Sequence, residues 1–379
     1  MFWRNDPSDV TNRRMRRFMW VVAVGLCATL GFNACGGGGG GGGTPAGPPP
    51  PNPLYVSARR GKDTNIGDRS APLKTISKAA QIVRSGYSVF VGSGTYQEGV
   101  TTPSVGTPPQ GIQFIADVSG AQTGDSAGAV IVDVSTAPSQ AGFNLFNSPG
   151  SMIDGFEIRG AGDAGIVIKN GSTDFTIQNC VVHDNPGDGI RVQDSSNAVV
   201  FNNLVYNNQQ RGIAIVAAVA GSPNANIISN TIVSNHAVGL TIGNAAPKPP
   251  SSGAFVRNNI VEQNLGDSNV KVFTDPRSDL GLDEDFDLIF PAGSFNPKSI
   301  QGKHDVGTQA LFLNASTGDY HLRSNSTNAL DVGDSLSNMQ ALANLLRGRT
   351  TTGGTDCDKG ALDLGFHYAP SGRCTTVVP

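Results

Sequence analysis

The sequence predicts an all-β protein folded as a parallel β-helix, in which short strands wind into coils that stack along one axis. Two observations predict this class. The 379 residues include 49 glycines and 30 asparagines, a composition typical of short strands joined by tight turns. A similar seven-residue segment also recurs through the middle of the chain, and the apolar residues between positions 155 and 273 do not follow helical spacing.

The recurring segment occurs four times between positions 179 and 264. It reads NCVVHDN, NNLVYNN, NTIVSNH and NNIVEQN, and the copies begin at Asn179, Asn202, Asn230 and Asn258, at intervals of 23, 28 and 28. Such a period with short apolar strands is typical of a solenoid. Leucine-rich repeats and propeller blades are excluded because neither the LxxLxLxxN framework nor the Trp-Asp signature is present, which leaves the β-helix. The equivalent first strand positions are Ile166, Ile190, Ile213, Leu240 and Val270.

Successive coils of a β-helix lie about 4.8 Å apart, so equivalent residues stack in rows. Inward rows of Val, Ile and Leu make the core. A stacked asparagine can hydrogen-bond to the asparagines above and below it and also satisfy the backbone of a bend. We therefore expect a structural row of asparagines, and at least seven coils between about Val89 and Phe273. The expected row consists of Asn179, Asn202, Asn230 and Asn258.

The open ends of a solenoid expose strand edges that must be covered. At the N-terminal end, SAPLKTISKAAQIVRSG predicts a capping helix with Ser70 as its N-cap, Pro72 in its first turn and Gly86 as its stop. Near the C-terminus the repeat register is lost, and a short helical pattern at 336–346 indicates a terminal cap.

The first 35 residues predict an export signal. Four arginines precede an apolar run at 18–31 that is short for a membrane span, and translation from Met15 would already supply a complete signal. The sequence Phe-Asn-Ala-Cys at 32–35 resembles a bacterial lipobox, which makes Cys35 the lipidated N-terminus; an ordinary cleaved signal is the alternative. Eight glycines and a proline-rich stretch then form a tether.

Three cysteines remain in the folded part. In an oxidising compartment, Cys357 and Cys374 are predicted to form a disulfide, and Cys180 to be a small buried side chain. The predicted organisation is a lipoprotein signal peptide at 1–35, a tether at 36–53, an N-terminal cap with the first coils at 54–110, β-helix repeats at 111–275, and C-terminal coils and cap at 276–379.

The stretch from Tyr55 to Val100 resembles the N-terminal domain of unknown function that precedes pectate-lyase-like β-helices, through YVS, the pair Gly61 and Asp63, APLKTI and GTYQEGV. The middle resembles the right-handed β-helix repeat. The tail resembles that of choice-of-anchor-type bacterial surface proteins, through NNIVEQN, GDYHL, ALDVGD and GALDLG. The resemblance implies a right-handed parallel β-helix that engages an acidic polysaccharide.

A lyase acting on uronate chains needs a base, often Lys or Arg in such folds, and a cation, usually calcium, that neutralises the sugar carboxylate. Asp163 and Asp188 occupy similar turns and are the predicted substrate and calcium ligands, and Arg211 takes the corresponding place one coil later. The predicted catalytic residues are Arg191, Arg211 and Lys271. Lys169 is predicted to bind substrate on or beside the same strand row.

Two functions remain open. One is a polysaccharide lyase or, less favoured, a glycoside hydrolase; the other is a non-catalytic carbohydrate-binding or structural surface protein. The sequence has no Asp-Asp dipeptide, and the marks of polygalacturonase-like proteins are missing. The acidic run at 279–287 offers carboxylates for calcium but lacks the regular spacing of a calcium-binding loop, so it is interpreted as a solvated loop. A net charge of −3 gives no basic surface for nucleic acid, so no nucleic-acid partner is expected. The protein is expected to be a monomer that is attached to the cell envelope by its lipid alone.

Overall fold

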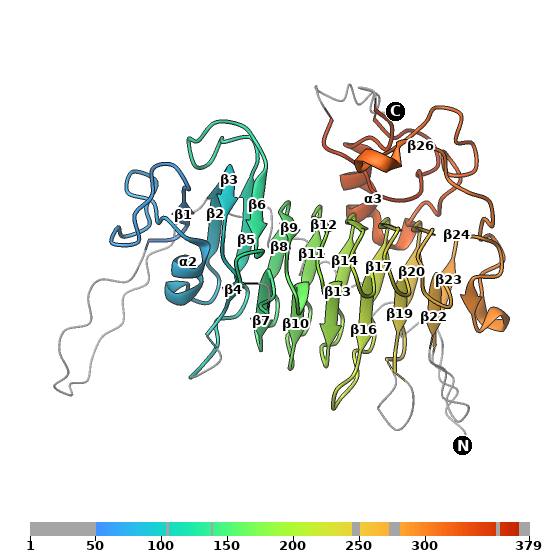
Figure 1. Cartoon of the computed structure of the whole chain (residues 1–379), viewed down its shortest axis with the longest axis horizontal. Helices are drawn as coiled ribbons and strands as arrows, with labels where there is room; N and C mark the ends of the chain where they lie inside the picture. Colours follow the sequence, from blue (N-terminus) through green and yellow to red (C-terminus); the bar gives the residue numbers. More distant parts are fainter. Residues whose placement is uncertain are drawn as a thin grey trace, which may run out of the picture.

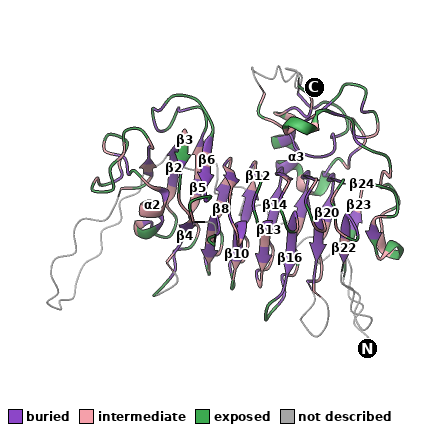
Figure 2. Cartoon of the chain, in the orientation of Figure 1, coloured by how far each residue is buried: buried purple, intermediate pink, exposed green. Residues whose placement is uncertain are grey.

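A computed structural model describes residues 51–103, 106–137, 139–244, 251–272, 281–353 and 357–370. It confirms the predicted right-handed parallel β-helix with an N-terminal capping helix. Each coil contributes one short strand to each of three sheets, and the coils stack along the long axis of the molecule (Figure 1). Buried residues follow the strands along this whole length, so the core is one continuous column inside the coils (Figure 2).

The three sheets are parallel throughout. Sheet A contains, in order, β1 (Leu54–Val56), β2 (Ser88–Gly92), β5 (Gln113–Asp117), β8 (Met152–Asp154), β11 (Thr176–Gln178), β14 (Val199–Phe201), β17 (Asn226–Ile228), β20 (Phe255–Arg257) and β23 (Asp283–Asp285). Sheet B contains β3 (Gly94–Tyr96), β6 (Val130–Asp133), β9 (Glu157–Arg159), β12 (Val181–His183), β15 (Leu204–Tyr206), β18 (Thr231–Val233), β21 (Ile260–Glu262) and β24 (Leu288–Phe290). Sheet C contains β4 (Val100–Thr101), β7 (Phe143–Phe146), β10 (Ala164–Lys169), β13 (Asp188–Gln193), β16 (Ile213–Val216), β19 (Leu240–Ile242), β22 (Val270–Val272) and β25 (Phe295–Asn296).

The register of sheet C confirms the predicted strand equivalence. Ile166 pairs with Ile190, Ile190 with Ile213, and the row continues through Leu240 to Val270. All five side chains are buried in the core column. Because side chains alternate along a strand, the residue after each of these faces outward.

The predicted asparagine row is wrong by one residue at Asn230. Asn202 Nδ2 donates to Asn179 Oδ1 at 2.8 Å, but the third member of this corner row is Ser229, which shares its positive φ. Asn230 belongs to the adjacent row, which points inward and contains Asn203 and Asn259. The corner row has intervals of 23, 27 and 29 residues. The two equal intervals of 28 in the sequence therefore place Asn230 in the wrong row.

The inward row is a hydrogen-bonded ladder of fully buried amides. Asn203 Nδ2 donates to Asn230 Oδ1 at 3.0 Å, Asn230 Nδ2 to Asn259 Oδ1 at 3.0 Å, and Asn259 Nδ2 to Asp287 Oδ1 at 2.8 Å. Each of these asparagines also donates to backbone carbonyls at the bend. At the other end of the ladder stands Cys180, a buried free thiol as predicted, whose backbone N–H donates to Asn203. A second ladder at the next corner joins Asn185, Asn208, Asn235, Asn264 and Asn269.

The N-terminal capping helix α2 spans Ile76–Ile82, so the predicted start at Ser70 is wrong. Thr75 is the N-cap, and its side chain accepts from the N–H of Lys78. The preceding residues instead form a loop closed by Asp63, which accepts from the N–H groups of Lys74 and Thr75. The helix ends at Ile82, and its C-cap is Val83 rather than Gly86.

The C-terminal part covers the end and one side of the column (Figure 1). Residues 297–306 follow the last coil, and Val306 bridges to Leu288 of β24. The hairpin of β26 (Phe312–Asn314) and β27 (Asp319–Leu322) packs on the outer face of sheet B, and α3 (Gln340–Arg347) packs on that of sheet A. No helix in the described part of the chain is long and apolar enough to span a membrane.

Candidate functional site

The candidate site is a groove on the outer face of sheet C. The register there makes an outward row of Val167, Arg191, Ala214, Thr241 and Lys271. Turns that precede these strands supply the opposite wall. The groove is lined by Gly162, Asp163, Pro186, Gly187, Asp188, Arg191, Gln210, Arg211, Ala237, Val238, Thr241 and Lys271. The structure therefore gathers five of the six predicted site residues of the β-helix in one place.

Asp188 is the centre of an ionic network in this groove. The carboxylate is buried, with 3% of the residue exposed. Its Oδ1 accepts from the backbone N–H and Nε of Arg211, at 3.1 and 2.9 Å, and its Oδ2 accepts from Arg211 Nη2 at 2.8 Å. Arg191 Nη1 lies 3.4 Å from the same Oδ2. Both carboxylate oxygens are therefore engaged, and Arg211 is held in a fixed, bidentate orientation.

Arg191 connects the two aspartates. Its Nη2 forms an ion pair with Asp163 Oδ1, and its side chain is 19% exposed. Asp163 itself is more open to solvent. A guanidinium offers a rigid fork of N–H donors and no acceptor, so Arg191 and Arg211 suit the role of anion ligand better than that of base.

Two sequence predictions about this row need correction. Asp188 pairs with Ala164 rather than with Asp163, so the two aspartates are one register position apart. The two turns have the same length, but Asp163 stands three residues before Ile166 and Asp188 two residues before Ile190. Lys169 lies opposite Gln193, two residues along β10 from the row of Arg191, and it does not line the groove.

Lys271 closes the far end of the groove. It lies three coils beyond Arg191 in the same outward row, and its ammonium group pairs with Asp267. Among the described residues, the groups of three or more acidic or other metal-binding side chains close enough to share an ion are Glu284 with Asp287 and Asp305, and Asp331 with Asp358 and Asp363. The groove is not among them, and Asp188 has no free oxygen for an ion. Calcium at the groove stays a prediction.

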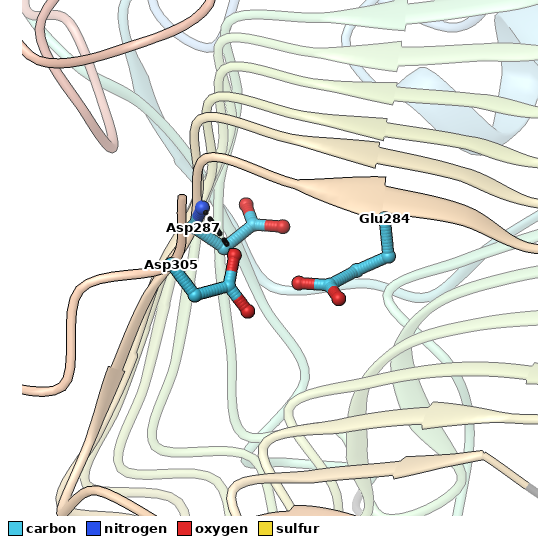
Figure 3. Close-up of side chains that lie close together, drawn as sticks. All are labelled: Glu284, Asp287 and Asp305. Atoms are coloured by element: carbon cyan, nitrogen blue, oxygen red, sulfur yellow. Dashed lines mark hydrogen bonds between the residues drawn. The ribbon is translucent and has the colours of Figure 1, made fainter. Parts of the chain in front are cut away.

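The acidic run near position 284 is not the solvated loop that the sequence suggested. Glu284 points into the core column from β23, and Asp287 follows at the corner of the same coil; they are 8% and 1% exposed. Figure 3 shows both carboxyl groups facing Asp305 of the covering segment. Burial raises the pKa of both Glu284 and Asp287. The sequence-based prediction did not apply strand alternation to this run. Glu284 stands in the same inward row as Val256 and Ile227, and this position predicts its burial.

A second polar cluster lies where the C-terminal hairpin meets sheet B. The ring of His183 stacks on that of Tyr206, with centroids 4.8 Å apart, and its Nδ1 and Nε2 lie near Asp184 and Glu157. Burial lowers the pKa of His183, but the hydrogen bonds with these two carboxylates outweigh it and raise the pKa. Tyr206 in turn contacts Tyr320 of β27, with ring centroids 5.0 Å apart, so the cluster links sheet B to the hairpin.

Two predicted covalent sites concern the chain ends. Cys357 is disulfide-bonded, but its predicted partner Cys374 lies outside the described residues, so the pairing stays a prediction. Cys35 and residues 36–50 of the tether also lie outside the described residues.

The fold and the groove define the class of this protein as a right-handed parallel β-helix with a charged outer face. A family model described as the Pel9A-like right-handed β-helix region matches residues 54–245. This match covers half of the chain, which therefore belongs to the Pel9A-like right-handed β-helix family. Among curated proteins, none matches the chain.

Several solved structures are similar to the chain. A GH136 lacto-N-biosidase from Eubacterium ramulus is 14% identical with a TM-score of 0.48, over 68% of this chain and 55% of the biosidase. The pectate lyase Pel9A is 16% identical with a TM-score of 0.43, over 76% of this chain and 93% of the lyase. A rhamnogalacturonan lyase is 15% identical with a TM-score of 0.33, over 63% and 68%. The chain thus spans about half the length of the biosidase.

Proposed function

We propose that the protein binds an acidic, uronate-containing polysaccharide in the groove on sheet C. The observation that carries this proposal is the Arg211–Asp188 pair. Two hydrogen bonds fix the guanidinium plane, yet 30% of the Arg211 side chain is exposed, and its Nη1 makes no hydrogen bond to any described residue. A fixed guanidinium with donors free towards solvent is suited to a carboxylate ligand.

The arrangement of the cations along the column supports a polymer rather than a small acid. Arg191 and Arg211 come from neighbouring coils, and Lys271 comes from a coil farther along the same face. Adjacent coils are separated by about 4.8 Å, so the three side chains form a line that a chain of charged sugars can follow. Lys169 lies two residues along β10 from this row and outside the groove.

A second candidate function is β-elimination by a polysaccharide lyase, and the placement of Lys271 favours it. Lys271 lies in the same outward row as Arg191 and lines the groove. In this role its amine would remove the proton next to the sugar carboxylate, while Arg191 and Arg211 neutralise that carboxylate. Asp163 and Asp188 would orient the arginines. Membership in the Pel9A-like family supports this candidate.

The proposal includes the cell location. We infer that the signal at 1–35 exports the chain, that Cys35 carries the lipid, and that the tether at 36–53 holds the β-helix away from the membrane surface. Eight consecutive glycines followed by prolines support this inference, since this composition is typical of linkers. The acidic polysaccharide would then be an extracellular or envelope glycan.

Titration calorimetry with polygalacturonate tests the binding. We expect the wild-type protein to bind, and Arg211→Gln to bind at least about tenfold more weakly, because a charge-assisted bidentate contact contributes about 1.5–3 kcal/mol. Lys169→Gln is the matched control: it removes a cation from the same sheet but outside the groove. Equal loss in both variants, or equal binding of a neutral galactan, would contradict the groove assignment.

Lyase activity has a separate readout. The protein is incubated with polygalacturonate, with and without calcium, and unsaturated product is followed by its ultraviolet absorbance. If Lys271 is the base, Lys271→Met abolishes product formation while calorimetric binding persists. Binding without product from the wild-type protein would leave the non-catalytic binding function and remove the lyase.

A further inference from the structure

The last coil of the β-helix contains three carboxyl groups that the groove does not use. Glu284 comes from β23 and Asp287 from the following corner, and Asp305 comes from the segment that covers the end of the column (Figure 3). One oxygen from each carboxyl group lies within 4.8 Å of the other two. In the described part of the chain, no lysine, arginine or histidine forms an ion pair with any of the three.

Both residues from the last coil break a row that is otherwise uncharged. Glu284 pairs with Val256 and stands where the preceding coils have Val256, Ile227 and Val200. Asp287 takes the place of an asparagine at the end of the inward ladder. Burying a carboxylate costs several kcal/mol unless a partner compensates its charge, so two such substitutions in one coil need a common partner.

The hydrogen bonds hold one oxygen of each carboxyl group and leave the other without a partner. Glu284 Oε2 accepts from the N–H of Gly302 at 2.7 Å. Asp287 Oδ1 accepts from the N–H and Nδ2 of Asn259 at 2.6 and 2.8 Å, and Asp305 Oδ1 accepts from the N–H of Asp287 at 3.0 Å. Glu284 Oε1, Asp287 Oδ2 and Asp305 Oδ2 are buried and accept no hydrogen bond. The backbone thus orients three carboxyl groups, two of them more than nine-tenths buried, each with one unused oxygen.

We propose that Glu284, Asp287 and Asp305 bind a structural calcium ion that ties the covering segment to the last coil of the β-helix. Calcium takes oxygen ligands at about 2.3–2.6 Å, so oxygens that share one ion lie up to about 5 Å apart, as these can. Magnesium is the poorer fit because it keeps several water ligands, whereas Glu284 and Asp287 are buried. The site is separate from the groove on sheet C and does not depend on the proposed polysaccharide function.

The competing explanation is that the three carboxyl groups are neutralised by shared protons rather than by calcium. The variant Asp287→Asn distinguishes these two explanations. Asparagine occupies this position of the ladder in Asn203, Asn230 and Asn259, so the variant keeps the packing and the hydrogen bond from Asn259. If protons neutralise the cluster, this change leaves the protein as stable as before or more stable at neutral pH. If calcium does so, the change removes a ligand and the response to calcium.

The test uses protein freed of metal with EDTA and titrated with calcium chloride. We expect one calcium ion per chain by calorimetry in the absence of polysaccharide. The thermal midpoint should rise by about 5 °C when calcium exceeds its dissociation constant about one hundredfold, and magnesium should raise it less. Asp287→Asn and Asp305→Asn should each lose this rise and retain the β-sheet circular dichroism of the wild type. Asp305 lies in the covering segment and not in a coil, so Asp305→Asn still tests the site if Asp287→Asn folds poorly.

Two control variants locate the ion. Asp163→Asn alters the groove, and Asp331→Asn alters the other acidic cluster, in which His367 already lies 2.9 Å from Asp358. Both should keep the full rise of the thermal midpoint with calcium. A wild-type protein that binds no calcium, or a calcium response lost in Asp163→Asn but kept in Asp287→Asn, would overturn the proposal.

Discussion

Arg211 and Asp188, from consecutive coils, form a bidentate ion pair in which Nε and Nη2 lie 2.9 and 2.8 Å from the two carboxylate oxygens. The carboxylate is buried, whereas the guanidinium is partly exposed in the groove. We therefore expect the buried carboxylate of Asp188 to contribute to stability and the exposed part of Arg211 to bind the ligand. Substituting one partner or the other should change stability and glycan affinity to different extents.

Asp188→Asn should lower both stability and glycan affinity. The amide cannot accept the four approaching N–H groups as the carboxylate does, and Arg191 and Arg211 lose a buried counter-ion. We expect a loss of about 2 kcal/mol in the free energy of unfolding, measured with denaturant. Asp163→Asn is the control: its side chain is 38% exposed, and it should cost less than about 1 kcal/mol. Similar costs for both variants would refute the central place of Asp188.

Asn230→Ala should be among the most destabilising changes in the column. Its fully buried amide joins Asn203 to Asn259 and donates to the carbonyls of Val200 and Ile228. Truncation leaves these groups unpaired, and we expect a loss of about 3 kcal/mol in denaturant unfolding. Asn226→Ala is the matched control in the same coil, since Asn226 makes one 3.3 Å bond to the carbonyl of Asn224. A small effect at Asn230 would show that the ladder adds little stability.

Glu262 should make stability depend on pH. It is fully buried under the C-terminal hairpin, and burial raises its pKa from 4.5 to about 7, although the N–H of Ala310 opposes the shift. A raised pKa in the folded state stabilises the fold below about pH 4.5, and this contribution is lost as the pH rises through 7. Glu262→Gln should therefore match the wild type near pH 4 and exceed its unfolding free energy by about 2 kcal/mol at pH 8. A difference that is the same at both pH values would disprove the assignment.

Cys35→Ser tests the proposed anchor. If Cys35 carries lipid, the wild-type protein should fractionate with membranes and have a mass larger than its mature chain by that of the acyl groups. The serine variant should lose both properties. A membrane-bound serine variant would point to another mode of attachment.

Much of the fold follows from the sequence because every coil of a solenoid repeats the same strand positions, so one correct alignment of the repeats places most of the chain. The spacing of Ile166, Ile190, Ile213, Leu240 and Val270 identified the strand row of sheet C, and each position is buried as expected. The error at Asn230 arose because a corner asparagine and the inward asparagine next to it are adjacent in the chain. Only the hydrogen bonds separate them: Asn203 and Asn230 join the ladder, while Asn202 binds the backbone of His367.

The candidate site was predicted in part for the same reason. Stacking brought Asp188, Arg191 and Arg211 together as expected, because equivalent turns must lie over one another. Lys169 fell outside the groove because its row is two residues away. The buried carboxyl cluster was missed because Asp305 comes from the irregular covering segment, to which no repeat assigns a position.

The central claim is that Arg211 binds a sugar carboxylate on sheet C, and a crystal structure with a short galacturonate oligomer tests it most directly. The account predicts a carboxylate within hydrogen-bonding distance of Arg211 Nη1, with the oligomer running along the groove from Asp163 towards Lys271. An oligomer bound on another face, with the Arg211–Asp188 pair unchanged and free of ligand, would contradict it.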